Sequence, residues 1–68
     1  MKVKEVIKYQ KDLEQKYFIF VDKGTLKKVI IELQAFEQIR SSMAYDHKLD
    51  IIANYLIHIV NRYKYKYA

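Results

Sequence analysis

The fold of this chain depends on residues 17–33, which read YFIFVDKGTLKKVIIEL. Residues 17–21 are all aromatic or β-branched, a composition typical of a β-strand. The only glycine of the chain is Gly24. In the order Asp22-Lys23-Gly24 it stands where a three-residue hairpin loop needs a left-handed residue. Residues 29–33 then alternate in the manner of a returning strand. We therefore predict a β-hairpin over about residues 17–33.

The same stretch also fits helices. Thr25 is a suitable helix cap, and Gly24 before it would end the preceding helix. Helical spacing is kept by a set of apolar residues, namely Leu26, Val29, Ile30, Leu33, Phe36 and Met43. This alternative predicts an all-α three-helix bundle. The hairpin is preferred because four consecutive apolar residues, 18–21, are hard to bury in one helix stripe.

The flanking segments are predicted to be helical. We expect a helix from about Lys2 to Gln15, with a strand as the alternative because residues 3, 5, 7 and 9 share one face of an extended chain. From about Gln34 onward both alternatives predict helix, first through Met43 and then, after a cap at Asp46, over about 47–63. The resulting fold class is α+β, in one domain spanning residues 1–68, with the last few residues frayed.

Composition limits the class of protein. The chain of 68 residues is 51% hydrophobic, with one glycine, no proline and no cysteine, which opposes disorder and leaves no thiol for zinc or redox chemistry. No run reaches the roughly 18 to 20 apolar residues that span a bilayer. We expect a soluble, cytoplasmic protein that has no membrane partner.

No residue pattern predicts a reaction. Ser41, Ser42 and Thr25 lack the strained, glycine-flanked turn of an activated nucleophile. His47 and His58 are about 16 Å apart on one helix, too far to share a metal ion. One glycine cannot form a phosphate-binding loop. We therefore predict no enzymatic activity, no metal and no cofactor.

An excess of apolar residues in the last helix predicts a homodimer. Between Leu49 and Val60 they cover an arc of roughly 200° on a helical wheel, more than one core-facing side needs. The helix is therefore expected to contact both its own core and a second copy. The predicted interface residues are Ile52, Leu56, Ile57, Ile59, Val60 and Tyr63.

The net charge of +5 predicts an anionic partner. Residues 1–28 carry eight lysines and four acidic residues, and residues 62–67 alternate cations with tyrosines. Lysine and arginine neutralise phosphates, while tyrosines stack on bases. The predicted contacts to DNA or RNA are Lys8, Lys27, Lys28, Arg62, Lys64, Tyr65, Lys66 and Tyr67.

The favoured expectation is thus a small basic homodimer that regulates genes by binding nucleic acid. Small size and a composition rich in Lys, Ile and Tyr associate it with a compact viral or plasmid genome. The alternative is a protein-binding module or inhibitor that docks through the last helix or through the edge of the hairpin. A minor structural or assembly protein is the third expectation.

Overall fold

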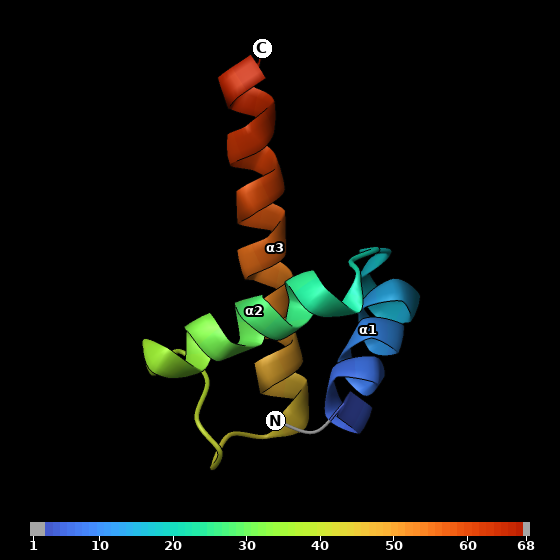
Figure 1. Cartoon of the computed structure of the whole chain (residues 1–68), viewed down its shortest axis with the longest axis vertical. Coiled ribbons are helices and arrows are strands. Elements are labelled where there is room, and N and C mark those ends of the chain that lie inside the picture. Colours follow the sequence, from blue (N-terminus) through green and yellow to red (C-terminus); the bar gives the residue numbers. More distant parts are fainter. Residues whose placement is uncertain (1–2, 68) are drawn as a thin grey trace.

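Residues 3–67, the part of the chain whose backbone the structure describes, fold into three α-helices (Figure 1). The computed structural model describes the backbone of residues 3–67 and the side chains of residues 3–60. Helix α1 spans Val3–Tyr17, α2 spans Lys23–Ala35 and α3 spans Tyr45–Tyr67. Helix α2 crosses α3, and α1 lies beside the first half of α3, so that the last turns of α3 extend beyond the other two helices (Figure 1).

The predicted β-hairpin is wrong, since residues 3–67 contain no strand and residues 23–35 are helical. Gly24 is not in the left-handed conformation that the hairpin loop requires. Instead, Asp22 caps α2: its backbone is extended, and a carboxylate oxygen accepts a hydrogen bond of 3.0 Å from the backbone N–H of Thr25. These contacts stabilise a helix start. The all-α alternative is therefore the correct one, with Asp22 rather than Thr25 as the cap.

Hydrogen bonding at this cap also changes the acidity of the capping group. Hydrogen bonds from the side chain of Thr25 and from its backbone N–H lower the pKa of Asp22. The carboxylate form accepts these bonds and is the form that suits the positive end of the α2 dipole.

Residues 18–21 do not form a strand because they connect α1 to α2 with alternating exposure. Phe18 has a φ of 56°, a left-handed conformation that turns the chain away from α1. Phe18 and Phe20 are 79% and 75% exposed, whereas Ile19 and Val21 pack against the core. The aromatic composition that suggested a strand therefore belongs to an extended linker with two phenylalanines on its surface.

The predicted helix through Met43 is also wrong, because α2 ends at Ala35. Glu37 has a φ of 58°, and the N–H of Gln38 donates to the carbonyl of Leu33 at 2.9 Å. This is the hydrogen bond of a Schellman motif, which reverses the chain after a helix. Residues 36–44 form a connection in which Ile39 is buried and Phe36 is 69% exposed.

The predicted N-terminal and last helices are confirmed in type, with α1 beginning at Val3 and α3 beginning at Tyr45. One apolar core joins the three helices. Its buried members are Val6, Tyr9, Leu13, Leu26, Val29, Ile30, Leu33, Ile39, Leu49, Ile52, Ala53 and Leu56. Among the described residues, no polar or charged residue is buried. Among the side chains that the structure describes, Leu56 is the last core residue of α3, and the helix continues to Tyr67.

Replacing Glu37 by glycine should stabilise the protein. A residue with a side chain in the left-handed conformation is strained by about 1–2 kcal/mol, and glycine avoids most of that cost. The lost ion pair to Arg40 is exposed, with an N···O distance of 3.7 Å, and contributes little. We expect Glu37→Gly to raise the free energy of unfolding by about 1 kcal/mol in urea titrations.

Glu37→Ala is the control, because it removes the same ion pair and keeps the strain. It should be no more stable than the wild type. Equal stabilities of the glycine and alanine variants would show that the turn at Glu37 stores no strain.

Candidate association surface

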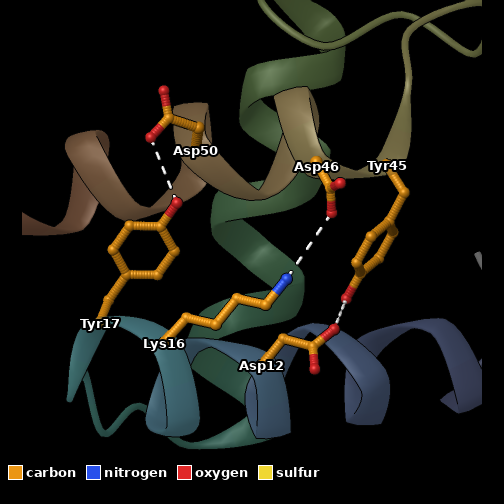
Figure 2. Close-up of polar contacts among 6 residues, drawn as sticks. All are labelled: Asp12, Lys16, Tyr17, Tyr45, Asp46 and Asp50. Atoms are coloured by element: carbon orange, nitrogen blue, oxygen red, sulfur yellow. Dashed lines mark hydrogen bonds and ion pairs between the residues drawn. The ribbon is translucent and has the colours of Figure 1, made fainter.

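A ladder of polar contacts fixes α1 against the first turns of α3 (Figure 2). The hydroxyl of Tyr45 donates a hydrogen bond to the carboxylate of Asp12. Next along the helices, the ammonium nitrogen of Lys16 lies 3.7 Å from a carboxylate oxygen of Asp46. The hydroxyl of Tyr17 then donates a hydrogen bond of 3.2 Å to the carboxylate of Asp50. Because successive contacts run toward the end of α1, they set the register of the two helices.

Aromatic packing reinforces the start of this ladder. The rings of Tyr9 and Tyr45 stack with centroids 4.9 Å apart, and the ammonium of Lys8 lies 4.3 Å from the centroid of the Tyr45 ring. Burial, followed by the hydrogen bond to Asp12, raises the pKa of Tyr45. Burial, followed by the charge of Glu5, raises the pKa of Tyr9. Both hydroxyls therefore stay protonated to a higher pH than that of a free tyrosine.

The ladder brings the linker after α1 against the middle of α3, where an open apolar groove results. Its walls are Phe18, Ile19 and Phe20 from the linker, and Leu56, Ile57 and Val60 from α3. All six lining residues are apolar, and its volume is about 280 Å³. We call this feature the linker groove. Phe18, Phe20, Ile57 and Val60 are among the large apolar side chains that the described structure leaves exposed.

The linker groove lies on a stripe that runs the length of α3. Leu49, Ala53, Leu56 and Val60 follow each other at spacings of four, three and four, the seven-residue pattern of a helix that packs along another helix. Leu49, Ala53 and Leu56 are at most 7% exposed, while Val60 is 53% exposed. In the sequence the pattern continues with Tyr63 and Tyr67. The stripe is thus covered in its first half and open at Val60.

The predicted interface residues divide between the core and the surface. Ile52 and Leu56 are buried within the monomer, which accounts for their apolar character without a partner. Ile57, Ile59 and Val60 are 44%, 36% and 53% exposed. The side chain of Tyr63 lies outside the described residues. Sequence reasoning missed Phe18 and Phe20, although four apolar residues in a row exceed what one buried stripe accommodates.

The predicted nucleic-acid contacts lie in different places. Lys27 lines a second groove, between α1 and α2, with Val3, Val6, Lys23 and Gly24. Lys8 is at the contact between α1 and α3, and Lys28 is exposed on α2. The side chains of Arg62, Lys64, Tyr65, Lys66 and Tyr67 lie outside the described residues. The structure therefore places Lys27 beside Lys23 and leaves Lys8 on another part of the surface.

Little in the arrangement of the described residues is specific to catalysis or metal binding. Among them, no group of three or more His, Asp or Glu side chains is placed to hold a metal ion. A third groove, between α2 and α3, is lined by eight residues that include Glu32, Phe36 and His58. No helix in the described part of the chain has both the length and the apolar character needed to cross a bilayer.

Comparison with known proteins identifies no relative, since no family model, curated protein or solved structure matches the chain.

Removing the Tyr45 hydroxyl should weaken the contact between α1 and α3 without removing the ring stack. We expect Tyr45→Phe to lower the free energy of unfolding by about 1.5–3 kcal/mol at pH 7, the usual contribution of a hydrogen bond to a charged group. Folding raises the pKa of Tyr45. The stabilising contribution of its hydroxyl is therefore present below about pH 10, the pKa in the unfolded chain, and falls as the pH rises beyond that value.

The stability difference between wild type and Tyr45→Phe should therefore shrink from pH 8 to pH 11 in denaturant titrations. Tyr17→Phe is the control for the exposed end of the ladder and should cost less. A difference that stays constant with pH would contradict the linkage between folding and the Tyr45 hydroxyl.

Proposed function

We propose that this chain is a non-enzymatic association protein that works as a homodimer built on α3. The observation that carries the proposal is the apolar stripe of α3, which is buried through Leu56 and 53% exposed at Val60. Exposed Phe18 and Phe20 flank the open part. Large contiguous apolar surfaces are rare on monomeric soluble proteins and usually mark interaction sites.

The surface area supports the same proposal. A compact monomer of this mass is expected to expose about 4,600 Å², and this chain exposes 5369 Å². The excess of about 800 Å² is similar to what each partner buries in a standard protein interface. The Cα radius of gyration of 12.0 Å also exceeds the value of about 11 Å for a compact domain of this length. Pairing through the projecting half of α3 would cover the excess.

Small size gives such pairing a further role. A domain of this length buries only about 60% of the surface that its unfolded chain exposes, so its stability is marginal. Burying one large apolar side chain contributes about 1.5–3 kcal/mol. The exposed residues of the linker groove would therefore add substantially to the stability of a dimer, after the entropy of association is subtracted.

Substituting one groove phenylalanine should dissociate the dimer. We expect sedimentation equilibrium to show a wild-type dimer at tens of micromolar. Phe20→Ser should weaken association at least tenfold, as for an aromatic residue at the centre of an interface.

Phe36→Ser is the matched control, because Phe36 is an exposed aromatic residue outside the linker groove. It should leave the dissociation constant unchanged. A wild type that remains monomeric at about 1 mM would contradict the homodimer, and an equal effect of the two substitutions would move the interface away from the linker groove. A partner protein of another kind would then be the occupant to consider.

Nucleic-acid binding is the second candidate, and it is favoured by the position of Lys23 and Lys27 on the wall of the same groove. These residues are one turn apart and line one groove, and the first turn of α2 contains no acidic residue. A phosphate backbone suits such a surface, because lysines that neutralise phosphates release counterions.

Removing one of these charges tests the candidate. Wild-type binding to a labelled oligonucleotide should weaken steeply between 50 and 200 mM salt. Lys27→Gln should reduce affinity several-fold at low salt and make the salt dependence shallower. Lys11→Gln, which removes the same charge from an exposed position on α1, should have a smaller effect. Equal effects would indicate attraction by net charge alone, and an absence of binding at 50 mM salt would exclude this candidate.

A further inference from the structure

We infer that the two copies of α3 pair in antiparallel order, so that the last turns of each copy occupy the linker groove of the other. This inference rests on the homodimer proposed above and names what fills the groove. The symmetry would be two-fold, with the same surface used by both copies.

The geometry of the fold points to a second copy as the occupant. The linker groove is open and apolar, with walls at Leu56, Ile57 and Val60 of α3 itself. Helix α3 continues from these walls to Tyr67 and leads away from α1 and α2 (Figure 1). Because the last turns extend along the helix axis, they cannot fold back into the groove of their own chain. The same turns of a second copy can reach it.

The sequence of the last turns fits the groove. Tyr63 and Tyr67 continue the spacing of Leu56 and Val60, so the helix repeat assigns them to the same stripe. A two-fold axis near Val60 sets Ile57 opposite the partner's Tyr63, at the α3 wall of the groove. The partner's Tyr67 then lies level with position 53, one turn beyond that wall. Tyrosine suits this position, since an interface can bury its ring and leave its hydroxyl at the edge.

Charge decides between the two orders of pairing. Residues 62–68 contain Arg62, Lys64 and Lys66 and no acidic residue. Parallel helices would place these three cations beside the same three, and like charges that oppose each other at an interface are unfavourable. Antiparallel helices instead separate the two basic ends. With a two-fold axis near Val60, the partner's Lys66 lies level with position 54, one helical turn from the exposed Asp50. Antiparallel order therefore avoids the repulsion between basic ends that parallel order imposes.

Cysteine cross-linking tests the order directly, because the chain has no cysteine of its own and each variant carries one thiol. A disulfide requires Cα atoms within about 7 Å. Ile57→Cys and Tyr63→Cys, mixed as chains of different mass and oxidised, should form the mixed disulfide dimer. Tyr67→Cys alone should remain uncross-linked, because a two-fold axis near Val60 separates the two copies of this position by about 21 Å along the helix.

Parallel pairing predicts the opposite pattern. Tyr67→Cys would then cross-link to itself, and the mixed disulfide between positions 57 and 63 would not form. That result in a wild type that sediments as a dimer would overturn the antiparallel order and leave the homodimer intact. A dimer that forms neither disulfide would also overturn it. A wild type that sediments as a monomer would instead overturn the homodimer itself.

Discussion

The apolar stripe of α3 is longer than the surface that α1 and α2 provide to cover it. Helix α3 contains 23 residues and α1 contains 15, a difference of about 12 Å at 1.5 Å per residue. Since both helices begin near the same end of the molecule (Figure 1), this excess lies at the far end of α3. Burial through Leu56 and exposure at Val60 follow from that difference in length.

Two local features of the structure determine how far along α3 the other two helices cover its apolar stripe. The polar ladder fixes the register between α1 and α3, with Tyr17 at the level of Asp50. The left-handed backbone of Phe18 then stops α1, and Asp22 starts α2 a few residues later. Between these points the linker presents Phe18 and Phe20 to solvent beside α3. The linker groove is therefore a product of the same contacts that hold the helices together.

The sequence predicted part of the fold because helix periodicity is strong where a helix packs on one side only. The first and last helices were predicted for this reason, and the last helix was also recognised as having too many apolar residues for one core. Residues 17–33 were misread because apolar side chains at 29, 30 and 33 satisfy helical spacing, while positions 29, 31 and 33 alternate as in a strand. The tertiary core resolved this conflict by burying Val29, Ile30 and Leu33 together.

The candidate site was harder to predict than the helices. Exposure of Ile57 and Val60 depends on where α1 and α2 end, which periodicity does not specify. Phe18 and Phe20 resembled strand residues because their composition suits a sheet, and only the three-dimensional placement of the linker assigns them to a groove. The lysines were predicted by charge alone, which carries no information on which of them lie together. Only the structure shows that Lys23 and Lys27 line the same groove.

Hydrogen exchange of α3 at different protein concentrations tests the central claim most directly, namely that the uncovered half of this helix is covered by a second copy. Amides from residue 57 to residue 67 should become more strongly protected as the concentration rises from about 1 to 500 μM, whereas those near Leu49 should change much less. The same protection of residues 57–67 at every concentration would contradict the account.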